Sequence, residues 1–260
     1  MSEPYELSSE LPAPRLPGEV VVREEVADLL DAIAADLLVQ AKACVRAFGD
    51  FHLALSGGST PEPLYRRLMY DPRLRQFPWK KTHLWQVDER CVAEDDAQRN
   101  WGMISEILLD HSDIPAEQAH PMPVLEPDGD TRYEVELREA LEWREKGHDR
   151  LDFVLLGMGS DLHTASLFPG SVALEARAGR LVVFNEGPGV VPPRRMTMTF
   201  EMLNAARFVA VMVTGEAKRE AIGRLVGGGL DRMTAPIRGI EPVGGALRWY
   251  LDRKACPEGG

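Results

Sequence analysis

The chain of 260 residues is 44% hydrophobic and 27% charged, an ordinary globular composition with enough length for one large domain. Its 30 Lys and Arg against 41 Asp and Glu give a formal net charge of -11, which disfavours nucleic acid and anionic membranes as partners. Three cysteines without a common spacing, together with the absence of a signal peptide, a transit peptide or a bilayer-spanning apolar run, predict a cytoplasmic protein with reduced thiols.

The first predicted elements are a lead-in, a helix and a strand. Residues 1–19 are acidic and proline-rich and are expected to be extended, in front of a single α/β catalytic domain over residues 20–260. Apolar residues at steps of three and four predict a long amphipathic helix from Arg23 to Phe48. The apolar run FHLAL at 51–55 then predicts a buried strand that ends at a tight turn.

Strands and helices continue to alternate to the end of the chain. A proline-punctuated loop is expected over residues 111–130, and the segment ALRWYLDRKA at 246–255 is expected to form a short closing helix. Apolar strands that alternate with amphipathic helices indicate an α/β protein whose mostly parallel sheet is covered by helices on both faces. Further strands are expected at 82–87, 152–156, 181–184, 194–200 and 207–213, and helices at about 97–109, around Tyr133 to Leu141, and within 214–229.

Polar side chains gather directly after four of the predicted strands. In an open parallel sheet, ligands bind at the carboxyl ends of the strands, because the loops that follow the strands meet at one edge. Four segments that are far apart in the sequence are therefore expected to form one site. They are residues 56–60, 88–90, 157–163 and 214–218.

The first of these segments, SGGST, has the composition of a phosphate cradle. Its glycines let the backbone approach a ligand closely, and N–H groups at the start of the following helix can hold an anion. Thr60 is expected to cap that helix, with Pro61 as its first residue. A tight turn without a ligand has the same pattern, and a Walker motif is excluded by the spacing. The candidate contacts are Ser56, Gly57, Gly58, Ser59 and Thr60.

Charged residues on the other segments complete the expected binding site. Asp88 can orient a sugar hydroxyl or a catalytic group, and Arg90 can grip phosphate through its fork of donors, although a solvated turn has the same composition. Lys218 lies in the first turn of a predicted helix, where a cation is unfavourable unless an anion lies nearby. Arg195 is expected to face the pocket, and Arg194 the solvent.

The segment GMGSDLHTASLFPG carries the expected chemistry. Gly157 and Gly159 allow a sharp, open turn, and His163 stands two residues after Asp161. A histidine beside a carboxylate is suited to general base catalysis, because imidazole titrates near neutral pH and the carboxylate can fix its tautomer. The alternative is a loop histidine that only caps a helix.

Two other interpretations of this segment are disfavoured. The third glycine position of a dinucleotide fingerprint is occupied by Leu162, which argues against an NAD enzyme. Ser166 stands three residues after His163, but the chain has no G-x-S-x-G elbow, which argues against a serine hydrolase. The remaining histidines lack metal-ligand spacing, so no metal site is expected.

With these residues identified, the chain resembles the 6-phosphogluconolactonase family, which is related to the glucosamine-6-phosphate deaminases. The resemblance implies a Rossmann-like fold and hydrolysis of 6-phospho-D-glucono-1,5-lactone to 6-phospho-D-gluconate in the oxidative pentose phosphate pathway, without a metal or organic cofactor. It also implies that His163 is the base that activates water, with Asp161 beside it, and that the SGGST loop, Arg90, Arg195 and Lys218 contact phosphate and sugar. The matching blocks, in family order from about residue 25 to 252, are LALSGGSTPEPLYRRL, WQVDERCVAEDDAQRNWGM, DFVLLGMGSDLHTASLFPG, PPRRMTMTFEMLNAARFVAVMVTGEAKREAI and GALRWYLD.

The chain departs from the family's pattern at two places. The usual Asp-Gly-His reads Asp161-Leu162-His163, and if the middle position requires a positive φ, leucine is strained there by roughly 1–2 kcal/mol. The usual Ser-Asn pair reads Arg99-Asn100. Two alternative functions stay open: a deaminase, although that family's Phe-Asn-Glu run after the histidine is absent here, and a catalytically silent sugar-phosphate-binding protein.

Overall fold

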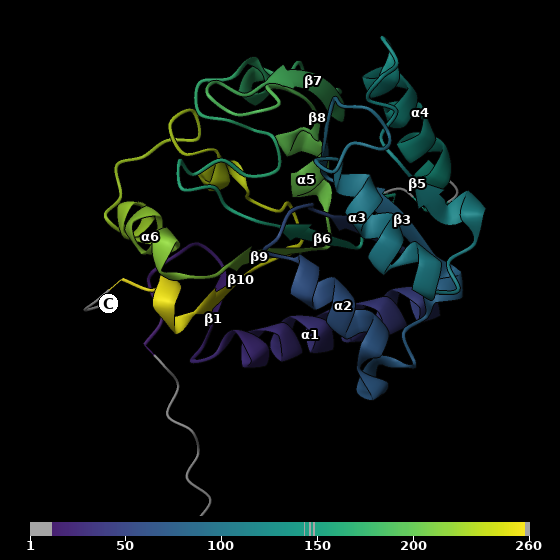
Figure 1. Cartoon of the computed structure of the whole chain (residues 1–260), viewed down its shortest axis with the longest axis horizontal. Helices are drawn as coiled ribbons and strands as arrows, with labels where there is room; N and C mark the ends of the chain where they lie inside the picture. Colours follow the sequence, from purple (N-terminus) through teal and green to yellow (C-terminus); the bar gives the residue numbers. More distant parts are fainter. Residues whose placement is uncertain (1–11, 143, 146, 148, 258–260) are drawn as a thin grey trace, which may run out of the picture.

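The computed structural model describes residues 12–142, 144–145, 147 and 149–257. At its centre lies a seven-stranded sheet in which all neighbouring strands are parallel (Figure 1). The parallel sheet expected from the sequence is therefore confirmed. In spatial order the strands are β1 (Glu19–Arg23), β10 (Ala246–Asp252), β9 (Phe208–Val213), β6 (Phe153–Leu156), β2 (Phe51–Leu55), β3 (Thr82–Gln86) and β5 (Ala119–His120).

Helices cover both faces of this sheet, as expected (Figure 1). In β2, Phe51 and Leu53 pack against one helical layer and Ala54 packs against the other, so every residue of the strand is buried. This is why the central strands read as continuous apolar runs instead of alternating ones. One layer holds α1 (Val26–Phe48), α2 (Glu62–Tyr70) and α3 (Asn100–Ile107), and the other holds α4 (Gly129–Glu142), α5 (Phe200–Ala205) and α6 (Arg219–Val226).

A second, antiparallel sheet departs from the prediction. It consists of β4 (Asp88–Arg90), β8 (Arg194–Met198) and β7 (Val182–Glu186), in the order β4-β8-β7. β7 and β8 form where strands are expected, but outside the parallel sheet, and β4 forms where a loop is expected. The reason lies in Val87, whose N–H donates to Leu55 at 3.0 Å and whose carbonyl accepts from Met198 at 2.8 Å. One residue thus joins both sheets and carries the chain from one to the other.

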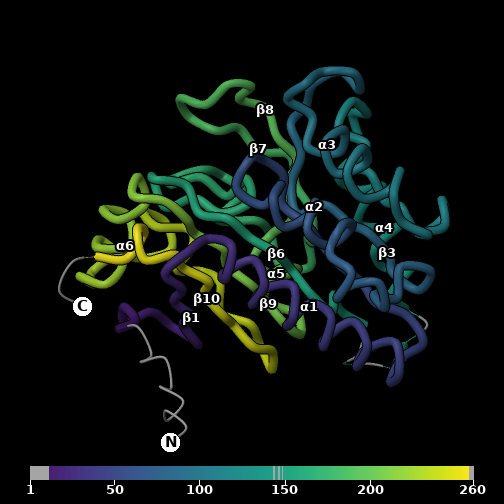
Figure 2. The backbone as a smooth tube through the Cα atoms, turned by 60° about the horizontal axis from the view of Figure 1, so that its bottom comes forward, coloured from purple at the N-terminus to yellow at the C-terminus, as the bar shows by residue number. Residues whose placement is uncertain are grey.

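The closing segment is a strand, so the helix expected there is wrong. β10 lies inside the sheet, between β1 and β9, and Figure 2 shows it beside β1 although the two come from opposite ends of the sequence. Trp249 and Leu251 face the layer that contains α6, whereas Tyr250 faces the layer that contains α1. This period of two is that of a strand buried on both faces. β1 itself lies where the lead-in and the first helix are expected to meet.

Several element boundaries also differ from the prediction. α1 begins at Val26 instead of Arg23, and β5 lies inside the expected loop over 111–130. α2 begins one residue later than expected, with Pro61 at the N-cap and Thr60 in the preceding turn. The carbonyl of Pro61 already accepts helical hydrogen bonds, so a cap by Thr60 is not needed.

Part of the expected lead-in, residues 1–11, lies outside the described part of the chain. From Pro17 onward the backbone is tied to the domain, since the carbonyl of Pro17 accepts a 2.8 Å hydrogen bond from the indole of Trp249. None of the described helices combines the length and the apolar character needed to cross a bilayer.

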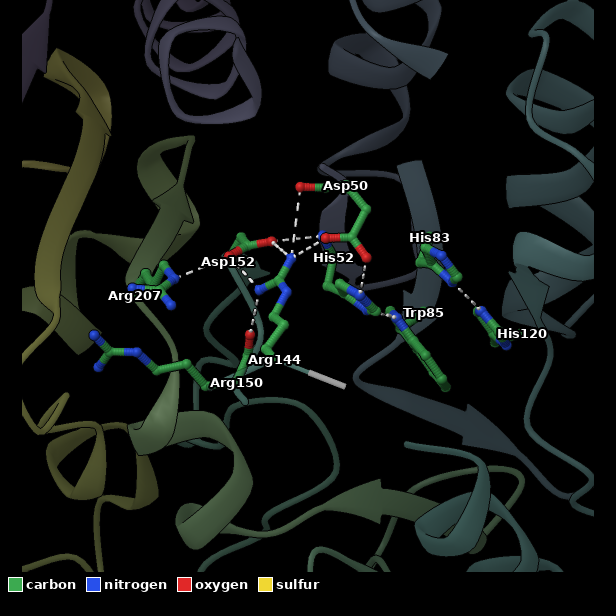
Figure 3. A network of polar contacts seen from close by, with 9 residues as sticks. All are labelled: Asp50, His52, His83, Trp85, His120, Arg144, Arg150, Asp152 and Arg207. Atoms are coloured by element: carbon green, nitrogen blue, oxygen red, sulfur yellow. Dashed lines mark hydrogen bonds and ion pairs between the residues drawn. The ribbon is translucent and has the colours of Figure 1, made fainter. Parts of the chain in front are cut away.

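A buried ion-pair network closes the amino ends of β2 and β6 (Figure 3). The side chain of Arg144 is 1% exposed; it binds Asp50 and donates to Asp152 Oδ2 at 2.8 Å. Arg207 donates to the other oxygen of Asp152 at 3.0 Å. Burial would raise the pKa of Asp50, but the contacts with His52 and Arg144 outweigh it and lower that pKa. The network therefore holds charges that are buried but paired.

Stacked aromatic rings extend this network toward β3 and β5 (Figure 3). The indole N–H of Trp85 donates to His52 Nδ1 at 3.1 Å, so His52 carries its proton on Nε2, which faces Asp50. The ring of Trp85 lies 3.6 Å from that of His120, and His83 lies 4.5 Å from His52. Burial lowers the pKa of His83 to about 3, so this ring is neutral at pH 7.

Candidate active site

The four polar segments that the sequence predicts to converge do meet at one place. They line a cavity of about 330 Å³ at the carboxyl ends of β2 and β6, beside β4. Asp161 is the one predicted site residue that is not part of the wall, and it contacts His163 instead. The predicted residues in the wall are Ser56, Gly57, Gly58, Ser59, Thr60, Asp88, Arg90, His163, Arg195 and Lys218.

His163 and Asp161 form a hydrogen-bonded pair. The Nδ1 atom of His163 lies 2.5 Å from Asp161 Oδ1, so Nδ1 carries the proton and Nε2 keeps its lone pair. Partial burial would raise the pKa of Asp161, but the interactions with His163, among them hydrogen bonds from its ring and its backbone, outweigh it and lower that pKa. A methyl group on Gly159 would come within 2.2 Å of His163 Nδ1 and 2.4 Å of Asp161 Oδ1. Only glycine leaves room for this pair.

Leu162 stands between the two residues in a left-handed conformation, with φ of 73°. Its backbone N–H donates to Gly159 at 3.0 Å, and its carbonyl accepts from Ile237 at 3.1 Å, which holds the turn. The conformation costs a leucine roughly 1–2 kcal/mol. Its side chain is fully buried in the core, which recovers about 1.5–3 kcal/mol. The turn therefore forms the His163–Asp161 pair with leucine in place of the family's glycine.

Replacing Leu162 with glycine is expected to destabilise the protein, although it relieves the strained φ. Removing a fully buried leucine side chain costs about 2–5 kcal/mol, and glycine adds about 0.5–1 kcal/mol of unfolded-state entropy, against roughly 1–2 kcal/mol of strain relieved. Urea unfolding should show a net loss of about 0.5–5 kcal/mol. A Leu162→Gly variant with a higher free energy of unfolding than wild type would contradict this balance.

The SGGST loop is shaped by its glycines. Gly58 has a φ of 97°, and a Cβ on Gly57 would lie 2.0 Å from Asn100 Oδ1, so both positions require glycine. The hydroxyl of Ser56 donates to the carbonyl of Leu155 at 2.8 Å, which fixes the start of the loop on β6. The loop therefore offers its backbone, Ser59 and Thr60 to the cavity.

Three cationic side chains line the cavity. The side chain of Arg90 donates to the carbonyl of Gln98 at 2.5 Å, while its Nε is buried and has no hydrogen-bond partner among the described residues. Lys218 Nζ lies 3.4 Å from Ser160 Oγ, and burial lowers its pKa. The third cation is Arg195, so a strongly positive wall exists inside a protein of net negative charge.

The two neighbouring arginines at the start of β8 point as the sequence predicts. Arg195 is 7% exposed and lines the cavity, where its Nε donates to Pro192 at 2.9 Å. Burial lowers the pKa of Arg195, although guanidinium remains protonated at neutral pH. Arg194 is exposed and covers the ring of Phe184. The alternation follows from the period of a strand.

The residues of β4 alternate in the same way. Asp88 is 7% exposed and lines the cavity; its Oδ2 accepts a 2.6 Å hydrogen bond from Ser166, and its carbonyl accepts from Asn100 at 3.1 Å. Glu89 points away from the cavity and is fully buried. Its carboxylate accepts from the N–H groups of Asn100 and Trp101 at 2.8 Å each, which fixes the start of α3.

Several other residues of the wall are not among the predicted site residues. Asn100, Ser166 and Phe168 all line the cavity. Phe168 reads as a core residue, but its ring lies 4.9 Å from that of His163. Ser166 draws attention only through its spacing after His163, which is set aside because the chain has no serine-hydrolase motif. Asn100 draws attention only through the family's Ser-Asn pair, because its contacts are with Asp88 and Gly57 on other loops.

Away from the cavity, one group of side chains has the composition of a metal site. Ligand atoms of Asp50, His52 and His83 lie within 4.8 Å of one another. Arg144 already binds this carboxylate, and Trp85 donates to His52. The two imidazole rings are stacked at an interplanar angle of 11°, so the lone pairs in their planes do not converge on one point. The described contacts favour a polar network over an ion site.

Sequence comparisons match most of the chain to one protein family. A family model described as glucosamine-6-phosphate isomerases/6-phosphogluconolactonase matches residues 24–249. The human GDH/6PGL endoplasmic bifunctional protein is 41% identical over 88% of this chain, and the chain spans only 29% of that protein's length. The 6-phosphogluconolactonase of Nostoc sp. is 37% identical over 85% of this chain and 90% of its own. That of Mycobacterium tuberculosis is 36% identical over 88% and 94%.

Solved structures share the same fold. The crystal structure of devB protein superimposes with a TM-score of 0.81 at 31% identity and covers 91% of this chain and 97% of its own. A 6-phosphogluconolactonase from Leishmania guyanensis superimposes with a TM-score of 0.77 at 29% identity, over 92% and 98% of the two chains. The expected Rossmann-like α/β fold is therefore confirmed.

Proposed function

Because the chain belongs to the family of glucosamine-6-phosphate isomerases and 6-phosphogluconolactonases, we propose that it hydrolyses 6-phospho-D-glucono-1,5-lactone to 6-phospho-D-gluconate, a step of the oxidative pentose phosphate pathway. The observation that carries this proposal is that His163, which is paired with Asp161, lines one cavity together with a glycine-rich loop and three cations. A base beside a phosphate cradle suits hydrolysis of a phosphorylated lactone.

The phosphate of the substrate is proposed to lie between the SGGST loop and the cations Arg90, Arg195 and Lys218. Backbone N–H groups of the loop are suited to a dianion. The start of α2 adds little, because Pro61 and Pro63 have no N–H and the N–H groups of Leu64 and Tyr65 donate to Pro61. Arginine forks bind phosphate oxygens in pairs, and two arginines, Arg90 and Arg195, line the cavity. Anchoring the phosphate in this way holds the lactone carbonyl near His163 and lowers the entropic cost of the reaction.

In the proposed reaction, Nε2 of His163 removes a proton from water as the water oxygen attacks C1 of the lactone. The carbonyl π bond opens to an oxyanion, and a hydrogen-bond donor of the cavity wall stabilises the negative charge. The C1–ring oxygen bond then breaks, and the ring oxygen takes the proton from Nε2. The products are a hydroxyl group and a carboxylic acid that ionises in solution. Asp161 keeps Nδ1 protonated throughout, so Nε2 can act as base and then as acid.

The deaminase alternative differs at one wall of the cavity. The deaminases continue with Phe-Asn-Glu after the histidine, whereas this chain continues with TASLFP and has no glutamate there. Phe168, from this segment, packs against His163. The decisive experiment is a lactonase assay with freshly generated 6-phosphogluconolactone, corrected for spontaneous hydrolysis, beside an ammonia-release assay with glucosamine 6-phosphate. Lactone turnover without ammonia release supports the proposal. Ammonia release without lactone turnover refutes it, and binding without turnover favours a sugar-phosphate-binding protein.

Replacing Lys218 with methionine is expected to raise KM for the lactone by about 10- to 100-fold with a smaller change in kcat, because a charge-assisted hydrogen bond to phosphate is worth about 1.5–3 kcal/mol. Lys80→Met is the matched control, since the side chain of Lys80 is 73% exposed and lies outside the cavity. Steady-state kinetics of both variants test this. An unchanged KM in the Lys218 variant would remove this residue from the phosphate site.

The proposed location is the cytoplasm. The three cysteines, Cys44, Cys91 and Cys256, are free thiols in the described structure, as a reducing compartment would leave them. Burial raises the pKa of Cys91 to about 11, so this thiol stays protonated and unreactive at neutral pH.

A further inference from the structure

Ser166 links the turn that carries His163 to the strand end that carries Asp88. Its hydroxyl donates to Asp88 Oδ2 at 2.6 Å, and the serine and the aspartate are 1% and 7% exposed. Both residues line the cavity. A hydroxyl has one proton, and here that proton is given to a carboxylate, so the serine is not poised as a nucleophile activated by His163.

The backbone of Ser166 is held on both sides by the second sheet. Its N–H donates to Thr197 Oγ1 at 3.2 Å, and its carbonyl accepts from Asn185 Nδ2 at 2.8 Å. Thr197 is also the register partner of Asp88 across β8 and β4. The serine and the aspartate are therefore both anchored to β8, which fixes the geometry of their hydrogen bond.

The same contacts determine which atom of Asp88 faces a ligand. Oδ2 is occupied by Ser166, and the carbonyl oxygen is occupied by Asn100. The hydrogen bonds of the described residues leave Oδ1 without a protein partner. A buried carboxylate with one oxygen held and one oxygen open presents a single directed acceptor to a cavity.

We propose that Ser166 is a positioning residue, which holds Asp88 so that Oδ1 accepts a hydrogen bond from a hydroxyl group of the sugar. The inference rests on the proposed function and deepens it, because it divides substrate recognition between two parts of the cavity. The SGGST loop and the cations bind the phosphate, whereas Asp88, oriented by Ser166, binds the polyol. A phosphate ion without a sugar makes only the first set of contacts.

The test compares three variants, Ser166→Ala, Ser166→Thr and Ser171→Ala, by lactonase kinetics and by inhibition with 6-phosphogluconate and with inorganic phosphate. Ser171 is the matched control, since it is also buried and bonded to Asn185 but does not touch Asp88. We expect Ser166→Ala to raise KM and the inhibition constant of 6-phosphogluconate by about 10-fold, with kcat and phosphate inhibition within about twofold of wild type. Ser166→Thr, which keeps the hydroxyl, should restore most of the loss.

A double-mutant cycle with Asp88→Asn separates positioning from a general structural role. If the serine acts through the aspartate, Ser166→Ala should add no further loss in the Asp88→Asn background. The inference is overturned if Ser166→Ala matches Ser171→Ala, if the two losses add, or if phosphate inhibition weakens as much as 6-phosphogluconate inhibition. Wild-type protein that does not hydrolyse the lactone would instead refute the proposed function. In that event, direct binding of 6-phosphogluconate and phosphate to the same variants still tests the role of Ser166.

Discussion

The variant His163→Ala is expected to lose about 10²- to 10⁴-fold in kcat for the lactone, with KM changed little. In the proposed reaction, His163 contributes proton transfer in the transition state but does not hold the phosphate. The remaining activity would come from anchoring of the substrate and from stabilisation of the oxyanion. The measurement is a lactonase assay from which the rate of spontaneous hydrolysis is subtracted. For a variant of low activity, spontaneous hydrolysis is faster than the enzymatic reaction.

Two further variants make this result specific. Asp161→Asn removes the carboxylate that holds Nδ1–H, so it should lower kcat substantially, but the loss should add little to that of His163→Ala because the two residues act as a pair. His111→Ala, at an exposed position outside the cavity, is the matched control and should retain wild-type kinetics. A His163→Ala variant with the kcat of wild type would refute the assignment of the base.

Replacing Arg144 with alanine is expected to destabilise the protein by about 3–5 kcal/mol, because it leaves buried carboxylates without their counter-charge. The side chain of Arg144 is 1% exposed and binds both Asp50 and Asp152 (Figure 3). Arg207 still pairs with Asp152, so Asp50 would bear most of the loss. Urea unfolding monitored by circular dichroism measures the change.

The matched control for Arg144 is a surface arginine with a similar number of partners. Arg73 also binds two carboxylates, Asp71 and Asp31, but its side chain is 68% exposed. Arg73→Ala should cost far less stability than Arg144→Ala, because solvent screens an exposed ion pair. Equal losses of stability in the two variants would show that burial does not govern the strength of the ion pairs around Arg144.

The site was predictable from the sequence because its residues follow strands. Parallel strands place their carboxyl ends at one edge, so the SGGST segment, Asp88, His163 and Lys218 are expected to meet there even though up to 162 residues separate them. The apolar runs at β2, β6 and β9 likewise predict the buried strands of the sheet. These are local patterns, and local patterns are what a sequence displays directly.

Other features of the fold and of the site could not be predicted from the sequence, because they depend on contacts between segments that are far apart in the chain. β10 contains residues that also suit an amphipathic helix, and only its burial between β1 and β9 decides that it is a strand. β4 is three polar residues long, too short for any periodicity, and it exists because β8 pairs with it. Ser166 and Asn100 join the cavity through hydrogen bonds to Asp88, which lies 78 and 12 residues away.

Leu162 combines both cases in one residue: its strain could be predicted from the sequence, but its packing could not. Its place between Asp161 and His163 predicts strain if φ is positive, and the structure has φ of 73°. What the sequence does not reveal is that the side chain is fully buried and the carbonyl is held by Ile237, so packing offsets the strain. Local chemistry thus determined which residues take part, and tertiary packing decided how their atoms are aimed, because the restraints that orient a side chain come from segments far away in the chain.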